Sequence, residues 1–158
     1  MSIESVREYF KKFDKDKDIL EFDISSATVE LAAVAAGTEE ARIAKTLSFI
    51  TKEDGPILIV ASGDAKVDNK KYKAQFGCKA KMVPFDDAET IIGHKVGGIC
   101  PFAINPDVKV YLDETLKRFE TSFPAAGSAN SAIELSCEEL EKYSQNFCSW
   151  VDVCKLPE

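Results

Sequence analysis

Lys45 is the first residue whose type and position could do chemistry. It falls in the alternating stretch 43–50, where Ile43, Leu47 and Phe49 share its face of an expected strand. A lysine on such a face must reach water, pair with an anion or line a polar cavity. Two interpretations stay open: a lysine that points to solvent, or a cation at the floor of a pocket that meets a carbonyl, phosphate or ribose oxygen.

The glycine-rich bend 93–102 is the second candidate. Gly93, Gly97 and Gly98 precede Pro101, so the backbone there can pass close to a ligand and turn its N–H groups inward. Such N–H groups can hold the oxyanion that develops when an acyl group is transferred or hydrolysed. A bend that serves only as a turn is the alternative interpretation.

His94 is the only histidine of the chain. A zinc site built from several histidines is therefore excluded, and a Ser-His-Asp triad would have to use this residue. The sequence has no G-x-S-x-G, Walker A or dinucleotide-binding motif. His94 is thus a general base, a hydrogen-bond donor to substrate, or a structural residue of the bend.

Small and polar residues make up most of the stretch 124–132, between segments expected to be apolar strands. The stretch is either a plain loop or a pocket wall that admits only a small side chain.

Six lysines lie within residues 66–81 against one acidic residue, Asp68. The net charge of −7 argues against a general nucleic-acid coat protein, but a locally basic edge can still meet a phosphate backbone. A solvated helix face is the alternative interpretation. The six residues are Lys66, Lys70, Lys71, Lys73, Lys79 and Lys81.

The helices that must position these residues follow from capping signals. One helix is predicted from the N-cap Thr28 to the stop at Gly37, and a lysine-rich helix from the N-cap Asp68 to Gly77. Residues 136–139 form a capping box, which predicts the start of a C-terminal helix.

The strands are predicted from alternating or continuous apolar residues. Residues 43–50 and 57–61, joined by the turn 53–56, predict a hairpin. Many short strands mixed with helices indicate an α+β fold with a curled or barrel-like sheet. The further strands are predicted over residues 19–23, 81–85, 108–112, 132–135 and 147–153.

The bulk composition is that of a globular protein. The 158 residues are few enough for one domain, and we expect residues 1–158 to form it. No apolar run approaches the roughly 20 residues of a membrane span, and the N-terminus lacks a signal-peptide pattern. The five cysteines include no C-x-x-C pair and indicate reduced thiols in a cytoplasmic protein.

Several segments, taken in order along nearly the whole chain, resemble the YbaK/EbsC family. This family comprises the editing (INS) domain of bacterial prolyl-tRNA synthetase and its free-standing relatives. The segments are residues 28–32 leading to Gly37, residues 43–47, Gly63-Asp64 followed by Asp68 and Lys71, residues 93–102, and residues 126–128.

The resemblance implies a mixed, barrel-like sheet flanked by helices and an aminoacyl-tRNA deacylase. Such an enzyme hydrolyses the ester joining a wrong amino acid to tRNA, often the tRNA for proline. The family's strand lysine corresponds to Lys45, and its G-x-x-x-P loop to residues 97–101. Its members need no metal, and we expect no cofactor.

Taken together with the residue chemistry and the lysine pattern, the resemblance leads to a hypothesis for the role of each residue. The loop N–H groups would hold the carbonyl oxygen, Lys45 would bind the phosphate or ribose end or position water, and a free hydroxyl of the terminal adenosine would assist. The expected catalytic residues are Lys45, Gly97, Gly98 and Ile99. The expected substrate contacts are Thr46, His94, Pro101, Phe102, Gly127, Ser128 and Asn130. The expected tRNA-backbone contacts are Lys66, Lys70, Lys71 and Lys73.

The chain departs from the Cys-specific branch of the family at residues 128–132. That branch carries a basic pair and then an acid after its Ala-Gly step, whereas a branch with Gly-Ser-x-Asn is closer to this chain. We expect removal of alanine, serine, threonine, cysteine or a small non-protein amino acid. The expected partners are aminoacyl-tRNA and a prolyl-tRNA or other synthetase. The alternatives are an inactive tRNA- or nucleotide-binding module of the same fold and a hydrolase for another small acyl ester.

Overall fold

The computed structural model describes residues 2–157. Within this range the α-helices are α1 (Ser2–Lys11), α2 (Val29–Ala36), α3 (Asn69–Phe76), α4 (Ala88–Ile91) and α5 (Cys137–Tyr143). The strands are β1 (Leu20–Glu21), β2 (Ile43–Thr51), β3 (Gly55–Ser62), β4 (Lys66–Val67), β5 (Lys109–Asp113), β6 (Thr121–Pro124), β7 (Ser131–Ala132), β8 (Leu135–Ser136), β9 (Phe147–Val151) and β10 (Cys154–Lys155). Short 3₁₀ helices are η1 (Asp16–Asp18), η2 (Glu40–Arg42), η3 (Phe85–Asp87) and η4 (Glu114–Arg118).

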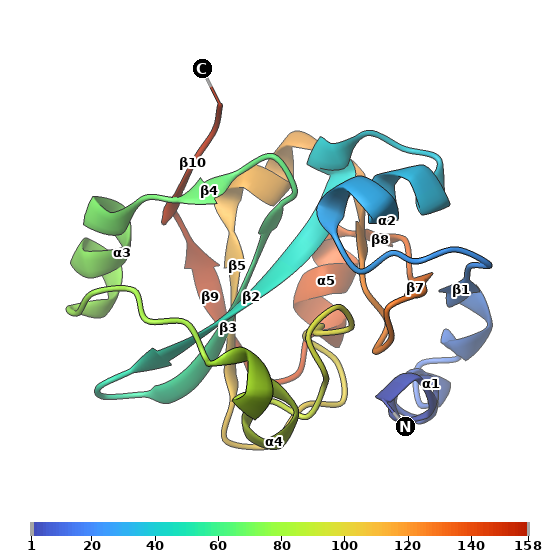
Figure 1. The fold of residues 1–158 in the computed structure, drawn as a ribbon, viewed down its shortest axis with the longest axis horizontal. Coiled ribbons are helices and arrows are strands. Elements are labelled where there is room, and N and C mark those ends of the chain that lie inside the picture. The colour runs from blue at the N-terminus through green and yellow to red at the C-terminus, as the bar shows by residue number, and fades with distance from the viewer. Residues whose placement is uncertain (1, 158) are drawn as a thin grey trace.

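A mixed sheet of six strands forms the centre of the molecule, in the order β8-β6-β2-β3-β5-β9. The predicted hairpin is confirmed as the antiparallel pair β2–β3, while β6 runs parallel to β2 and β5 runs parallel to β3. The hairpin crosses the middle of the molecule, with α3 near one end and α1 on the opposite side (Figure 1). The α+β fold with a curled mixed sheet is the one that the sequence predicts.

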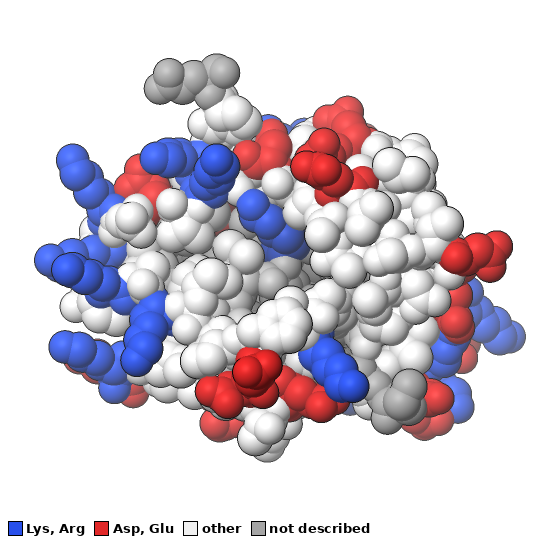
Figure 2. All heavy atoms as spheres, viewed as in Figure 1, with Lys and Arg blue, Asp and Glu red and all other residues white. Residues whose placement is uncertain are grey.

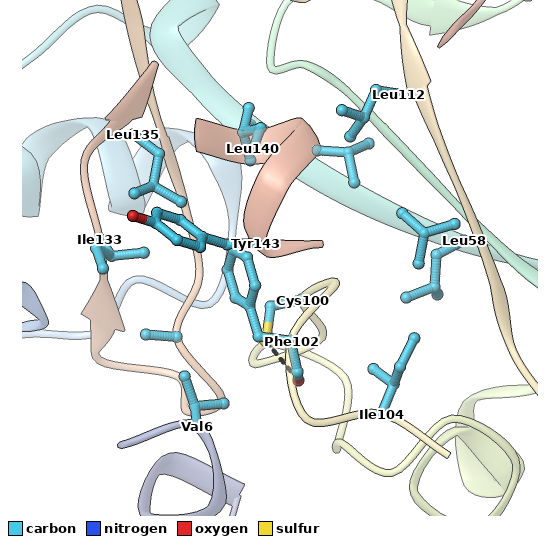
Figure 3. Packing of buried hydrophobic residues seen from close by; sticks show 14 of the residues in the cluster. Val6, Leu58, Cys100, Phe102, Ile104, Leu112, Ile133, Leu135, Leu140 and Tyr143 are labelled. Carbon is cyan, nitrogen blue, oxygen red and sulfur yellow. Dashed lines mark hydrogen bonds between the residues drawn. The ribbon is translucent and has the colours of Figure 1, made fainter. Parts of the chain in front are cut away.

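The two faces of β2 pack against different cores, as its alternation predicts. Phe49 lies in a cluster with Tyr72 of α3, and Lys45 shares this face of the strand. Ala44 belongs to the larger cluster on the other face, which includes Leu140 of α5. Side chains from the sheet, from α5 and from the bend 93–102 converge in that larger cluster (Figure 3).

Capping side chains fix the helices at the predicted positions. Thr28 accepts from the backbone of α2, and Asp68 caps α3. Ser136 and Glu139 form both bonds of the capping box that opens α5. None of the helices within residues 2–157 has the length and apolarity that crossing a bilayer requires.

The strand predicted over residues 81–85 is wrong apart from one bridge between Met82 and Phe49. Val83 still donates to Ser48, but Pro84 then turns the chain into η3. Proline has no N–H with which to continue a ladder, so the chain leaves β2 at this point. The strand predicted over residues 132–135 is instead two short strands, β7 and β8, and β6 was not predicted.

Candidate active site

The outer edge of β2 has a gap at residues 45–47. On this edge β6 pairs with residues 43–44, and the segment 81–83 is hydrogen-bonded near residues 48–50. These bonds show that the even-numbered residues of β2 direct their backbone groups away from β3. The N–H and C=O of Thr46 therefore face the gap, and within residues 2–157 no other segment bonds to them.

A pocket of about 410 Å³ opens at this gap. Its walls come from β2, the start of α2, the segment 82–85, the bend 93–102 and the small residues around β7. The lining is mostly apolar with a few polar groups, which is the usual composition of a small-molecule site. Lys45, Thr46, Gly97 and Ile99, four of the expected site residues, contact this one space.

Lys45 is the cation of this pocket. Its half-buried side chain donates from Nζ to the carbonyl oxygens of Gly63, at 3.4 Å, and Ala65. Burial lowers the pKa of its ammonium group from the ordinary 10.5, and the nearby charge of Lys66 acts in the same direction. Because its hydrogen-bond partners are carbonyls rather than a carboxylate, its charge remains available to an anionic or polar ligand.

Asp64 is the carboxylate whose charge affects the pKa of Lys45, and it is already paired with another residue. Asp64 forms an ion pair with Arg118, whose nitrogen lies 2.7 Å from the carboxylate. This hydrogen bond holds the pKa of Asp64 below its usual value. Asp64 therefore stays ionised but directs its charge toward Arg118 rather than into the pocket.

Two hydroxyl groups at the pocket have no partner among residues 2–157. Ser26, which is 7% exposed, and Thr46 both line it, and neither Ser26 Oγ nor Thr46 Oγ1 is hydrogen-bonded within residues 2–157. Buried polar atoms are normally satisfied by protein, water or ligand. Each oxygen has less than 1 Å² of accessible surface, so a molecule in the pocket could supply the missing bond only after the side chain rotates.

The bend 93–102 presents Gly97 and Ile99 to the pocket but not Gly98. The N–H of Gly98 donates to the carbonyl of Lys95 at 3.0 Å and so is used inside the bend. Gly98 also packs so tightly that an added Cβ would lie 2.7 Å from backbone atoms of Gly127 and Ser128. The expected oxyanion role thus fits Gly97 and Ile99 better than Gly98.

The three other expected contacts on the bend lie behind it, away from the pocket. His94 is fully buried and donates from Nε2 to the carbonyl of Phe102 at 2.7 Å, since a carbonyl can only accept. Burial lowers the pKa of His94 below its ordinary 6.5. Phe102 is fully buried among the rings of Phe10 and Tyr9, and Pro101 is buried beside it. Of the alternatives left open for His94, this geometry corresponds to the structural residue, and the expectation of direct substrate contact does not fit it.

The stretch 124–132 contributes different residues from those expected. Gly127 and Ser128 line a separate cavity together with Gly98, and not the pocket of Lys45. Asn130 is exposed and donates to the carbonyl of Phe22. The walls of the Lys45 pocket are formed instead by the small residues Ala125, Ser131 and Ala132.

The expected tRNA contacts Lys66, Lys70, Lys71 and Lys73, which we call the lysine surface, lie on β4 and α3. Basic side chains gather on the side of the molecule that carries these elements (Figure 2). Lys71 is partly neutralised, since its Nζ lies 3.0 Å from Asp152. None of these four lysines lines the pocket of Lys45, and Lys66 lies within electrostatic reach of Lys45, whose pKa its charge lowers.

Sequence reasoning missed the pocket residues outside the family motifs. Ser26 precedes the capped helix, while Met82 and Phe85 belong to the segment read as a strand. The proline at position 84 could have indicated this difference. Because proline cannot donate a ladder hydrogen bond, a strand is expected to end there, and the residues after it need not pack in the sheet.

Comparison with known proteins gives the following likenesses. A model of the aminoacyl-tRNA editing domain matches residues 25–143. The uncharacterized protein YwhH of Bacillus subtilis is 52% identical over 155 residues, which cover 98% of both chains. EbsC of Enterococcus faecalis, a candidate Cys-tRNA(Pro)/Cys-tRNA(Cys) deacylase, is 31% identical over 114 residues, covering 72% of this chain and 70% of its own.

Solved structures share the fold. The crystal structure of a candidate trans-editing enzyme for prolyl-tRNA synthetase matches with a TM-score of 0.83 and 24% identity, covering 98% of this chain and 97% of that one. The crystal structure of the hypothetical protein APE2540 matches with a TM-score of 0.82 and 24% identity, covering 96% and 99%. At such identities the likeness shows the curled mixed sheet and its helices, and it carries no argument about substrate.

Proposed function

The chain belongs to the aminoacyl-tRNA editing domain family, and we propose that it is an active deacylase acting in trans on wrongly charged tRNA. The observation that carries this proposal is the meeting of Lys45 with Gly97 and Ile99 around one pocket. An unpaired strand edge and two unpartnered hydroxyls in the same space support it. A module that only bound tRNA would have no need of this convergence.

The proposed reaction is hydrolysis of the ester on the terminal ribose. Water adds to the ester carbonyl carbon, the bond from that carbon to the ribose oxygen breaks, and the ribose oxygen takes up a proton. Backbone N–H groups of the bend and of Thr46 would stabilise the oxyanion, which is typically worth 10²–10³ in rate per donor. Lys45 would hold the ribose or phosphate end, or position the water.

A protein base is not required in this scheme. His94 is buried behind the bend and held by Phe102, so it is not placed to take a proton from water. An aminoacyl ester is already activated, and a free 2′- or 3′-hydroxyl of the terminal adenosine held beside the ester can assist the attack. The substrate would thus supply the group that the pocket lacks.

The pocket favours a small amino acid. Ala125 and Ala132 leave room for a short side chain, and Ser26 and Thr46 offer hydroxyls that could bind its amino group or a polar side chain. We propose alanine, serine, threonine or cysteine on the tRNA for proline as the substrates. A prolyl-tRNA synthetase is the candidate protein partner. Selection by size alone is worth about 1–3 kcal/mol per methylene, so we expect overlapping activity on these amino acids.

The lysine surface supports tRNA rather than a free small ester as the substrate. It lies on the side of the molecule that carries α3 and β4, so an acceptor stem could lie along it while its terminal ester enters beside Lys45. Contacts of lysine with phosphates give affinity that falls steeply with salt. This is the observation that separates the proposal from a hydrolase for another acyl ester.

A deacylation panel tests the proposed function. Ala-, Ser-, Thr-, Cys- and Pro-tRNA for proline would each be incubated with the wild-type protein, and loss of the ester compared with the rate without protein. We expect accelerated loss of at least one of the small amino acids and little of proline. No acceleration for any substrate, with tRNA binding intact, would favour the inactive binding module instead.

A further inference from the structure

Phe85 places a bare aromatic ring at the mouth of the Lys45 pocket. It lines the pocket yet is 72% exposed. Met82 and Val96, at 55% and 44% exposed, line the same space. Burying a phenylalanine side chain fully contributes about 1.5–3 kcal/mol of favourable free energy, which an exposed ring does not gain. A ring in this position is therefore suited to a partner that covers it.

The backbone under this ring is held in place. Val83, which is 6% exposed, anchors the segment through its bond to Ser48, and Pro84 starts η3 with Phe85 as its first residue. The bridge between Met82 and Phe49 ties the same segment to β2. The ring is therefore carried on a fixed support at the pocket mouth rather than on a free loop.

The charges around the ring indicate a neutral occupant. Asp86 and Asp87 follow Phe85 directly in η3 and would repel phosphate. Most basic side chains on this face gather on the side of α3 and β4 (Figure 2), and the exposed Lys95 precedes the pocket-lining Val96. A polynucleotide would thus run its phosphates along the lysine surface and bring an uncharged part of its end to Phe85.

We propose that Phe85 stacks on the adenine of the terminal adenosine of the tRNA, an inference that rests on the proposed function. With the ester beside Lys45, the ribose occupies the pocket mouth and its base extends outward. A pocket of about 410 Å³ is roughly 9 Å across if spherical, comparable to the reach from an ester through a ribose to its base. An exposed aromatic ring accepts a base by stacking, without regard to its hydrogen-bonding edge.

Kinetics on matched esters tests this assignment. Wild type, Phe85→Ala and Phe85→Trp would be compared on aminoacyl-tRNA, on the aminoacyl ester of adenosine and on the same ester of methyl riboside, which has no base. Phe85→Ala should raise KM about tenfold or more for the two substrates with adenine, leave kcat nearly unchanged, and leave the base-free ester unaffected. Phe85→Trp should keep the wild-type KM. Val34→Ala is the matched control, because Val34 is 71% exposed but does not line the pocket.

An equal effect of Phe85→Ala on all three esters would overturn the assignment, since the ring would then merely shape the pocket. The absence of an effect on all three esters would also overturn it, and a protein partner would then be the candidate that covers the ring.

A binding measurement separates this inference from the proposed function. In Phe85→Trp, adenosine should quench the new tryptophan fluorescence, with ribose as the negative control and wild type giving the background of Trp150. Quenching in Phe85→Trp without deacylation by wild type would support the adenine site and contradict the proposed deacylase activity. Deacylation by wild type without quenching in Phe85→Trp would support the proposed activity and contradict the adenine site.

Discussion

The two sides of the bend 93–102 differ in how tightly their groups are packed. Hydrogen-bond satisfaction does not separate them, because within residues 2–157 Nδ1 of the buried His94 also has no partner. On the inner side, His94, Cys100 and Phe102 are fully buried, and Phe102 both accepts from His94 and packs against Phe10. On the outer side, Gly97 and Ile99 face a pocket whose opposite wall carries unpartnered hydroxyls and a free strand edge. One short segment therefore separates a packed core from an open pocket.

This difference indicates a division of labour within the bend. The inner side chains hold the backbone so that Gly97 and Ile99 stay at fixed positions without a ligand. The outer side keeps its polar groups free, which costs stability but leaves them ready for a substrate. Changes on the inner side should therefore lower stability, and changes on the outer side should lower activity.

The largest effect is expected from removing the inner anchor. Phe102→Ala deletes a fully buried ring and should lower the free energy of unfolding by about 3–5 kcal/mol in urea denaturation. Phe102→Leu, which keeps most of the volume, should lose clearly less. A loss below about 1 kcal/mol in Phe102→Ala would show that the bend does not depend on this anchor.

Gly98→Ala tests the contact between the bend and the stretch 124–132. Its Cβ would lie 2.7 Å from backbone atoms of Gly127 and Ser128, so one segment must move. We expect about 1–3 kcal/mol of lost stability and a fall in deacylation beyond what that loss explains. Gly77→Ala is the control: it strains a positive φ of 74° far from the pocket and should leave the rate of the folded protein unchanged. Unchanged deacylation in Gly98→Ala would contradict a fixed bend.

Two threonines of β2 offer a matched pair for the outer side. Thr46 Oγ1 has no partner in the described part of the chain, so Thr46→Val should leave stability equal or higher while lowering kcat/KM about tenfold. Thr51 Oγ1 donates to the carbonyl of Gly55 at 2.9 Å, so Thr51→Val should lose about 1 kcal/mol of stability and keep its activity. The reverse pattern in urea denaturation and deacylation would remove the hydroxyl of Thr46 from the site.

The smallest effect is expected from the pH dependence of His94. Burial lowers its pKa below 6.5 in the folded state, so the unfolded chain binds a proton first as the pH falls. Stability should therefore decline from pH 6.5 downward until the folded pKa is reached, by at most about 1.4 kcal/mol per pH unit from this group. His94→Gln should flatten urea midpoints between pH 7 and 5.5. Equal slopes for the two proteins would mean that His94 is not held neutral.

The helix caps, the hairpin and the two faces of β2 could be predicted because they depend on local patterns. Thr28, Asp68 and the capping box act within a few residues of chain, and the alternation around Lys45 sets the faces of a strand. The prediction that Lys45 and the bend share one site came from the family resemblance. No local sequence pattern could have made it, because the two segments are far apart in the chain. The sequence could not predict whether the side chain of His94 faces the substrate or the core, because either face of a glycine-rich bend can lie against a ligand.

The rest of the pocket depends on long-range packing. Ser26, Phe85 and Ser131 meet there from segments far apart in the chain, and none carries a chemical signature of its own. The gap beside Thr46 arises because β6 and the segment 81–83 stop short of each other on one strand edge. Such a gap is a property of the assembled sheet.

The central claim is that the pocket hydrolyses aminoacyl-tRNA with Lys45 as its cation. The most direct measurement is the single-turnover rate of ester loss for the best substrate of the panel, in wild type, Lys45→Met and Lys52→Met. Lys52 is an exposed lysine at the hairpin turn and serves as the control for loss of one charge. We predict a rate at least about 100-fold lower for Lys45→Met and an unchanged rate for Lys52→Met. Equal rates for wild type and Lys45→Met would contradict the account.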